Sequence, residues 1–163
     1  MQEDIRHIIQ SHQARILKTC LGFTGDPEEA KDLAQEVLIN IWLGKDSFKQ
    51  KASVSTWIYR ITVNTCLMYK RKRKEIYQSL SEVADEGVLP EHLKNDHKQD
   101  IQLLTKLIAE LPEKDRIIMI LYLENLTYEE ISEVTGLNSN HIGVKINRIK
   151  QKLSKKFKAY GQS

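Results

Sequence analysis

The stretch from Leu126 to Leu153 constrains the fold more than any other part of the chain. Thr127 and Glu130 have the spacing of a capping box, which predicts the start of a short helix. Gly136 then marks a tight turn, and a longer, positively charged helix follows. A short helix, a turn and a second helix form a helix-turn-helix, which places its second helix in the major groove of DNA. This stretch therefore predicts a helical fold that reads DNA.

The rest of the chain also favours helices. Hydrophobic residues make up 40% and charged residues 29% of the 163 residues, so the chain can bury a core. Apolar residues recur at spacings of three and four, which is typical of amphipathic helices rather than strands. No apolar run approaches the ~18 residues of a membrane span, and the acidic, amphipathic N-terminus is unlike a signal peptide. We expect an all-α cytoplasmic protein without membrane insertion.

Residues 79–96 form the one credible linker, because they are polar, contain a glycine and a proline, and lack an apolar stripe. We expect two small helical domains, residues 1–75 and 98–160, joined by a flexible acidic linker at 76–97. Each domain has about the smallest size that folds without disulfides or metals.

Apolar stripes predict which helix faces form the core. Asp26 can cap the second helix, with Pro27 at its first position. The expected stripes are Ile5, Ile8, Ile9, Ile16 and Leu17 in the first helix; Ala30, Leu33, Val37, Leu38, Ile41 and Trp42 in the second; Val54, Ile58, Ile61, Thr65 and Met68 in the third; and Ile142, Ile146, Ile149, Leu153 and Phe157 in the last.

Charge is distributed unevenly along the chain. Residues 70–74 read KRKRK, and the chain beyond His141 holds seven basic residues and no acid. Between these zones, residues 75–100 carry seven acids against two lysines. Two basic zones around an acidic one indicate two nucleic-acid contacts joined by a segment that avoids DNA.

The last helix offers a DNA-reading face if its apolar stripe is buried. At ~100° per residue, the opposite side carries Asn140, Val144, Asn147, Arg148 and Gln151, flanked by His141 and Lys145. Asn and Arg can pair with adenine and guanine edges, and Val can pack on a thymine methyl group. The lysines from 150 to 158 reach only phosphates. The alternative is a solvated amphipathic helix that ends a small bundle.

Two further faces have open interpretations. Asp32, Gln35 and Glu36 share one helical face, which fits metal ligands, a catalytic pair, a protein-docking surface or merely a solvated face. A catalytic pair is disfavoured because no glycine-rich loop, nucleophile elbow or histidine-rich set accompanies it, and we expect no cofactor and no enzymatic chemistry. Cys20 and Cys66 lack the CxxC spacing and are expected to be reduced, half-buried thiols.

The third helix mixes aromatic, amide and basic side chains, which suits single-stranded nucleic acid because bases stack on rings and phosphates meet cations. The alternative is that Trp57 belongs to the core and the charges are solvated, and for Trp57 we favour the core. For residues 70–74 we favour nucleic acid, because adjacent like charges repel without a polyanion. The mixed residues are Trp57, Tyr59, Arg60, Asn64, Tyr69, Lys70 and Arg71.

Three segments together resemble the bacterial RNA polymerase sigma factors of the extracytoplasmic-function group, in the sigma-70 family. The segment DPEEAKDLAQEVLINIW is similar to the family's D-x-E-D-L-x-Q-E-V-F-x-x-x-W helix. FKQKASVSTWIYRITVN is similar to its F-x8-W-L-Y-R-I-A-x-N segment, and LPEKDRIIMILYLENLTYEEISEVTGL to its L-P-x3-R…L-S-Y-x-E-I-A-x3-G segment. All three occur in the family's order, with the linker between the second and the third.

The resemblance implies a role for each candidate surface. The face at residues 32–37 would dock on the clamp helices of the largest subunit of core RNA polymerase. The third helix and the loop before it would capture and melt the −10 element of promoter DNA. The helix-turn-helix would read the −35 element. The implied polymerase contacts are Asp32, Leu33, Gln35, Glu36 and Val37. The implied −10 contacts are Lys49, Lys51, Ser53, Trp57, Arg60, Asn64, Lys70, Arg71 and Arg73. The implied −35 contacts are Ser139, Asn140, His141, Val144, Lys145, Asn147, Arg148 and Lys152.

The chain departs from the family pattern at three positions. Met68 stands where the family often has Asp, and Gly143 and Val144 stand where its recognition helix often has Lys and Ser. We therefore carry over no promoter sequence. An anti-sigma factor that covers these surfaces is a further expected partner. The competing hypothesis is a stand-alone helix-turn-helix regulator with an N-terminal interaction domain, which leaves the acidic face and the aromatic, basic third helix without a role.

Overall fold

The computed structural model describes residues 4–49, 53–79 and 96–161, and within them the chain is helical without a strand. The helices are α1 (Ile5–Thr24), α2 (Pro27–Gly44), the short 3₁₀ helix η1 (Lys45–Ser47), α3 (Val54–Ser79), α4 (Asp96–Ala109), α5 (Glu113–Leu123), α6 (Tyr128–Thr135) and α7 (Ser139–Gly161). The all-α prediction is confirmed. Most of the predicted flexible linker, residues 80–95, lies outside the described residues.

The predicted helix starts form for the predicted reasons. The Asp26 side chain accepts a hydrogen bond from the Glu28 amide at 3.2 Å, and Pro27 occupies the first position of α2. At α6, Thr127 and Glu130 make both hydrogen bonds of the capping box. Gly136 ends α6 with a φ of 78°, a left-handed conformation that glycine adopts at little cost.

The core of the N-terminal half, residues 4–79, corrects three predictions. Leu17, Trp42 and Met68 were expected to be buried, but they are 39%, 42% and 58% exposed. In α1 the buried side chains are instead Ile16, Thr19, Cys20 and Phe23, all in the C-terminal half of the helix. In α3 the buried arc also includes Thr62, Val63 and Cys66, so it is wider than one stripe.

The two cysteines lie in this core as free thiols, more deeply buried than expected. Cys20 is 0% and Cys66 is 1% exposed. The pKa of Cys66 is raised well above its usual value, first by its hydrogen bond with the Cys20 thiol and then by burial. A raised pKa keeps the Cys66 thiol protonated and unreactive near neutral pH.

The C-terminal half, residues 96–161, confirms the predicted stripe of α7. Ile142, Ile146, Ile149 and Leu153 are buried, and Phe157 is partly buried against them. Helix α5 is buried all round at residues 116–121, which a one-sided amphipathic helix would not be. It is enclosed because α7 packs on one side and α1 packs on the other.

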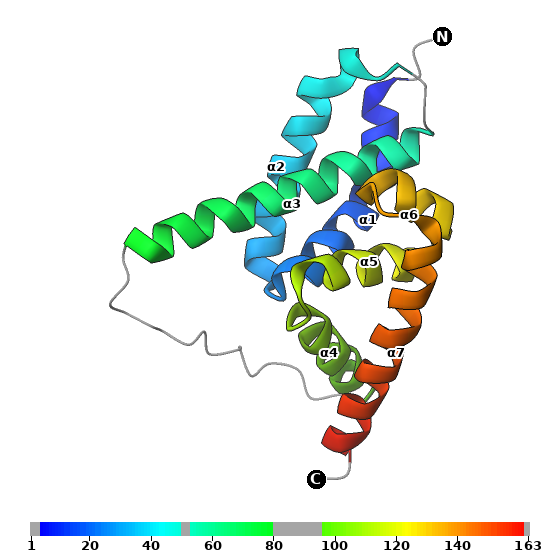
Figure 1. The fold of residues 1–163 in the computed structure, drawn as a ribbon. Helices are drawn as coiled ribbons and strands as arrows, with labels where there is room; N and C mark the ends of the chain where they lie inside the picture. Colours follow the sequence, from blue (N-terminus) through cyan, green and yellow to red (C-terminus); the bar gives the residue numbers. More distant parts are fainter. Residues whose placement is uncertain (1–3, 50–52, 80–95, 162–163) are drawn as a thin grey trace.

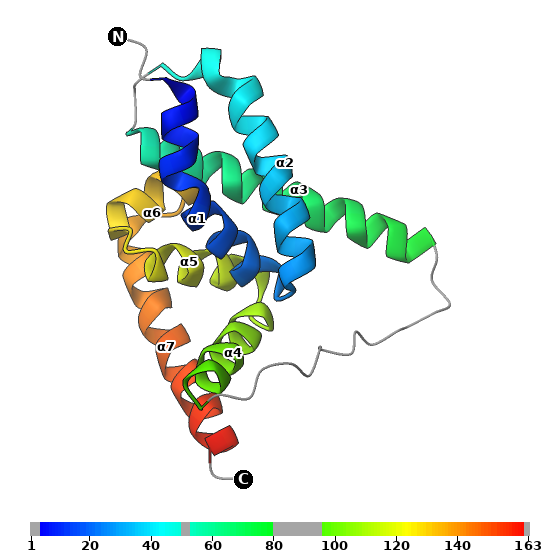
Figure 2. The ribbon, with the colours of Figure 1, turned by 180° about the vertical axis from the view of Figure 1, so that it is seen from behind.

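The two halves pack directly on each other, which the sequence did not predict. Helix α3 crosses α2 and α1, and α6 lies beside the N-terminal part of α3 (Figure 1). From behind, α5 lies between α1 and α7, while α4 contacts the end of α1 (Figure 2). The core is therefore continuous across both halves.

Candidate nucleic-acid and protein interfaces

The exposed face of α7 holds most of the predicted −35 candidates. Asn138 starts the helix, with its side chain accepting from the Asn140 amide at 2.9 Å. Two candidates, Ser139 and Lys145, are half-buried, and the Lys145 ammonium lies 4.0 Å from a carboxylate oxygen of Asp115. The exposed candidates are Asn140, His141, Val144, Asn147, Arg148 and Lys152. These side chains point away from the buried stripe, as a groove-reading face requires.

Gly143, which stands where the family often has Lys, lies against the ring of Tyr128. A Cβ atom on Gly143 would lie 3.2 Å from Cε2 of the Tyr128 ring. A side chain at 143 would therefore require the Tyr128 ring to shift by a few tenths of an ångström. The neighbouring Val144 is 52% exposed and presents an apolar surface where a hydroxyl is common in the family.

The start of α3 carries the next set of candidates. Ser53 is exposed, and its Oγ accepts from the Thr56 amide at 3.1 Å, which caps the helix. Trp57 is half-buried and packs on Phe48, with ring centroids 4.9 Å apart. Lys49 and Asn64 are exposed, whereas Lys51 lies outside the described residues. Trp57 therefore belongs partly to the core and partly to the surface.

Arg60 is exposed, but its guanidinium group makes a hydrogen bond to α6. Its Nη2 donates to the main-chain oxygen of Glu133 in α6, at 2.6 Å. This contact joins a candidate for −10 DNA to the first helix of the helix-turn-helix. It had no signal in the sequence, because the two residues are 73 positions apart.

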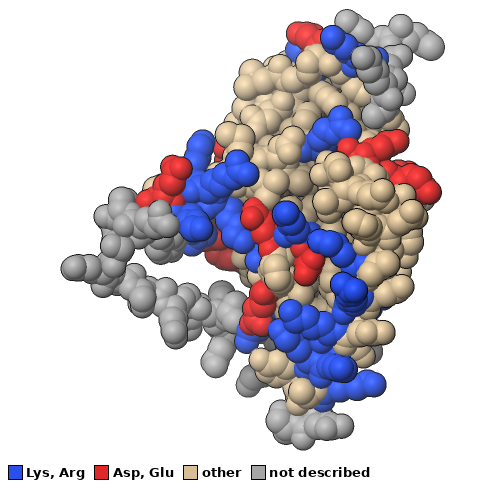
Figure 3. Space-filling view, viewed as in Figure 1, with Lys and Arg blue, Asp and Glu red and all other residues tan. Residues whose placement is uncertain are grey.

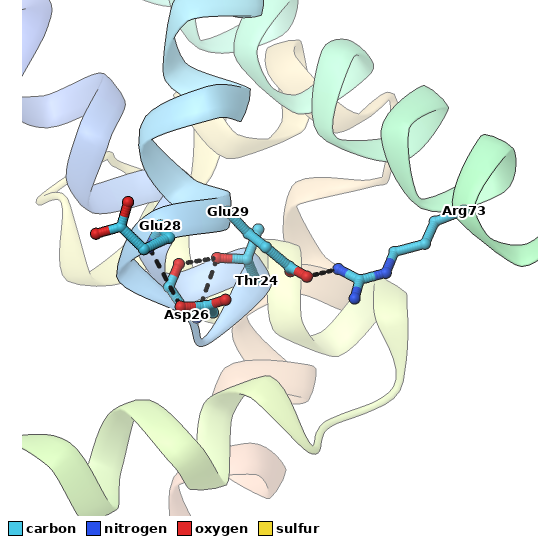
Figure 4. Close-up of polar contacts among 5 residues, drawn as sticks. All are labelled: Thr24, Asp26, Glu28, Glu29 and Arg73. Atoms are coloured by element: carbon cyan, nitrogen blue, oxygen red, sulfur yellow. Dashed lines mark hydrogen bonds and ion pairs between the residues drawn. The ribbon is translucent and has the colours of Figure 1, made fainter. Parts of the chain in front are cut away.

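The basic run at residues 70–74 is less uniform than its sequence suggests. Arg73 makes an ion pair with Glu29 in the first turn of α2, beside the capped turn at Asp26 (Figure 4). Lys70 is half-buried, and its ammonium lies 5.8 Å from the centre of the Phe23 ring. Burial, and then repulsion by Arg116, lower the pKa of Lys70. The fully exposed members are Arg71, Lys72 and Lys74.

Lys and Arg side chains gather in two places on the face shown in Figure 3. One group lies over the C-terminal part of α3 and the other lies along α7, with acidic side chains between them. Separate basic patches on two helices fit two contacts with a polyanion better than one continuous track.

The acidic face of α2 requires a correction. Asp32 and Gln35 are exposed and Glu36 is half-buried, but Leu33 and Val37 are 0% exposed. These two residues fill the core, so they do not belong to a contact surface. The helical period of 3.6 residues places positions 33 and 37 on the core stripe with Ala30 and Ile41. This stripe lies on the side of α2 opposite to Asp32 and Gln35.

The same face of α2 continues into exposed apolar side chains that the sequence reasoning missed. Ile39 is 58% and Leu43 is 73% exposed, seven and eleven positions after Asp32 and thus on its side of the helix. Trp42 lies beside them, with the Lys45 ammonium 3.7 Å from its ring centre. The available signal was that Ile39 and Leu43 fall outside the core stripe.

The described part of the chain contains no group of three or more His, Cys, Asp or Glu side chains placed to hold a metal ion. None of its helices is both long and apolar enough to cross a bilayer.

Comparison with known proteins identifies the family. The Sigma-70 region 2 model matches residues 8–76, and the Sigma-70, region 4 model matches residues 101–153. The ECF RNA polymerase sigma factor SigW of Bacillus subtilis is 30% identical, over 96% of this chain and 90% of its own length. The chain belongs to the ECF sigma factors. The RNA polymerase sigma factor SigV of the same organism is 28% identical, over 86% of this chain and 82% of its own.

Solved structures share the fold of this sigma factor. The sigma factor RpoE, in a complex with the anti-sigma factor NepR from Bartonella quintana, aligns with a TM-score of 0.79 and 21% identity, covering 94% of this chain and 96% of RpoE. CnrH, in complex with the cytosolic domain of CnrY, aligns with a TM-score of 0.71 and 16% identity, covering 98% and 90%. In this sigma factor, the region 2 match contains the candidate residues of α2 and α3, and the region 4 match contains those of α7.

Proposed function

We propose that this sigma factor joins core RNA polymerase and directs it to promoters by dividing the work between its halves. The N-terminal half, residues 1–75, would dock on polymerase and melt the −10 element, and the C-terminal half, residues 98–160, would read the −35 element. Residues 76–97 would connect them. Catalysis of RNA synthesis would remain with the polymerase, in the cytoplasm, and the sigma factor itself would need no cofactor.

The proposal is supported by two exposed faces whose side chains suit nucleic acid, one within each family match. On α7, Asn147 and Arg148 stand opposite the buried stripe, where they can contact base edges. Lys152, one turn further along, would contact phosphate. A stand-alone regulator would need only this face.

On α3, the exposed Asn64 and the half-buried Trp57 would hold an unstacked base of the −10 element. An aromatic ring offers a stacking surface, and an amide offers hydrogen bonds to a base edge. Arg71 and the exposed lysines near it would contact the adjoining phosphates. Arg73 would first have to leave Glu29, so its contribution to DNA binding would be smaller than that of Arg71.

Polymerase would bind the face of α2 that begins at Asp32 and Gln35 and ends at Leu43. An acidic start and an apolar end suit a protein interface, because exposed Ile39, Trp42 and Leu43 gain free energy when a partner covers them. The clamp helices of the largest subunit would be the partner. An anti-sigma factor would inactivate the chain by covering the same face or the DNA-binding faces.

Transcription with purified components tests the proposal. The sigma factor is added to core RNA polymerase and a library of promoter DNA, and the run-off transcripts are sequenced. We expect transcripts that start at discrete positions downstream of one shared pair of elements. Tight binding to duplex operator DNA without promoter-specific transcripts would instead support a stand-alone helix-turn-helix regulator.

A further inference from the structure

The centre of the exposed face of α7 is apolar, although its surroundings are polar. Val144 is 52% exposed, and every other exposed side chain of α7 between residues 139 and 156 is polar or charged. At ~100° per residue, Val144 lies opposite the middle of the buried stripe of this helix. Its side chain therefore points away from the core, toward whatever α7 binds. The buried stripe consists of Ile142, Ile146, Ile149 and Leu153.

The two sequence neighbours of Val144 leave its side chain open. Gly143 lies against the ring of Tyr128 and carries no side chain that could cover Val144. On the other side, Lys145 is half-buried, with its ammonium 4.0 Å from a carboxylate oxygen of Asp115 in α5. An exposed apolar side chain that its own helix leaves uncovered gains free energy when a ligand covers it.

Polar side chains lie one turn before and one turn after Val144 on the same face. Asn140 precedes it by four residues and Arg148 follows it by four, and both are exposed. A helix that brings these two side chains to base edges brings Val144 into the groove between them. An apolar side chain gives a hydrogen-bonding base edge no partner, which is unfavourable where water is excluded. Val144 therefore favours a base that offers an apolar group.

Thymine is the base whose major-groove edge offers that group. Guanine, cytosine and adenine present hydrogen-bond donors and acceptors there, whereas thymine adds a methyl group at C5. Burial of one such group favours binding by about fourfold. Serine, which the family often has at this position, carries a hydroxyl that can bond to several base edges. Valine at position 144 thus exchanges a permissive contact for a selective one.

We propose that Val144 makes this sigma factor select a thymine at one position of the −35 element, through the C5 methyl group of that base. The proposal rests on the proposed function, because it takes α7 as the helix that reads −35. The selected feature is a methyl group at C5, so 5-methylcytosine at the same position is preferred over cytosine. Val144 thereby makes the −35 contact sensitive to methylation of cytosine at C5.

Removal of methyl groups from the DNA tests the proposal with the full chain. The chain is bound to core polymerase, and its affinity is measured for a promoter found by the run-off selection. Each thymine of the −35 element, on either strand, is replaced in turn by deoxyuridine, which lacks only the C5 methyl group. The protein variants are Val144→Ser, which removes the apolar contact, and Val144→Ile, which retains it. Both change an exposed side chain, so neither disturbs the core.

The expected result is one thymine at which deoxyuridine weakens binding of wild type about three- to fivefold. Val144→Ile should keep that loss, whereas Val144→Ser should abolish it. At the same position, wild type should bind 5-methylcytosine more tightly than cytosine, and Val144→Ser should not distinguish them. The changes in protein and DNA form a double-mutant cycle, so an effect of the methyl group on DNA shape alone cancels.

Two results would overturn the proposal: a −35 element at which no methyl deletion weakens binding, and a loss that persists unchanged in Val144→Ser. If the chain with core polymerase gives no promoter-specific transcripts, the proposed function fails. The same scan is then made on the duplex that the chain alone selects from a random library. A methyl effect that depends on Val144 there would support the proposal without the proposed function, whereas the absence of any selected sequence would overturn both.

Discussion

Arg60 of α3 is held by the main-chain carbonyl of Glu133 in α6, at 2.6 Å. A residue proposed to bind −10 DNA is thus hydrogen-bonded to α6, which packs on α7, the helix proposed to read −35 DNA. Because the acceptor is main chain, no side-chain replacement at position 133 removes it. The contact is lost when Arg60 is replaced or its side chain turns away, or when α6 moves away from α3.

Arg148→Ala should reduce −35 binding by about 1–3 kcal/mol if the guanidinium group reads a base. The loss should be concentrated at one position of the binding site, because a bidentate contact discriminates among bases. Binding of the variant to a library of −35 duplexes, compared with wild type, measures both the loss and its position.

Lys155→Ala is the matched control for Arg148→Ala. It removes an exposed positive charge from the same helix, further from its start, and should weaken binding equally for all sequences and reduce the salt dependence. If Arg148→Ala shows that uniform pattern too, Arg148 contacts only phosphate.

Asp32→Lys combined with Leu43→Ala should weaken binding to core polymerase at least tenfold. The pair reverses an exposed charge and truncates the most exposed apolar side chain on the proposed docking face, so neither change disturbs the core. Glu28→Lys, an exposed charge reversal one turn earlier, serves as the control. Equal weakening by Glu28→Lys would show that net charge, and not this face, governs binding.

Gly22→Leu should weaken the packing of the N-terminal half on the C-terminal half. The added side chain meets Ile120, and overpacking costs about 1–3 kcal/mol, which corresponds to roughly a 5- to 150-fold shift in the equilibrium. Because glycine is unfavourable within a helix, α1 itself is not weakened. Cys66 lines a small apolar cavity between the two halves, together with Ile120. Its modification by a thiol reagent should therefore become faster than in wild type.

Adding Ile120→Ala to Gly22→Leu supplies the rescue. The space vacated by Ile120 can accept the new side chain, so slow Cys66 modification should return. If both variants react equally fast, the effect of Gly22→Leu arises from damage to the N-terminal half.

Tyr59 should titrate well above the usual range of a tyrosine. Burial and then the negative charge of Glu124 raise its pKa to about 12. Because the folded-state pKa is raised, the contribution of Tyr59 to stability is complete below about pH 10 and is lost as the pH rises through about 12. Glu124→Gln should move the pKa down, but not fully to its usual value, because burial remains. NMR titration of labelled tyrosines, with Tyr59→Phe for assignment, measures the pKa. An unchanged value in Glu124→Gln would show that Glu124 does not act on Tyr59.

Local signals in the sequence predicted the local structure well. The cap at Asp26, the capping box of Thr127 and Glu130 and the buried stripe of α7 all depend on residues within a few positions of one another. The same stripe logic fixed the exposed face of Arg148 and Asn147. These features were therefore accessible from spacing alone.

The features that the sequence could not predict depend on contacts between segments that are distant along the chain. Met68 was expected in the core because it continues the stripe of α3, but no helix of the described chain covers it, and Leu17 and Trp42 are exposed for the same reason. Arg73 reaches Glu29 across 44 positions, and Arg116 reaches Phe23 across 93. Neither pair has a periodic signature, so the packing of the two halves had no counterpart in the pattern.

If one chain places α3 and α7 on two promoter elements, its two halves must lie further apart in the promoter complex than in the free chain, and a distance measurement tests this directly. Probes are attached through Gln10→Cys on α1 and Ser154→Cys on α7, both exposed positions, while the native thiols stay buried. Pulsed electron resonance gives the distance in the free chain and in the promoter complex with core polymerase. We predict one narrow distance distribution in the free chain and an increase on the order of tens of ångströms in the complex. An unchanged distance in an actively transcribing complex would contradict the account.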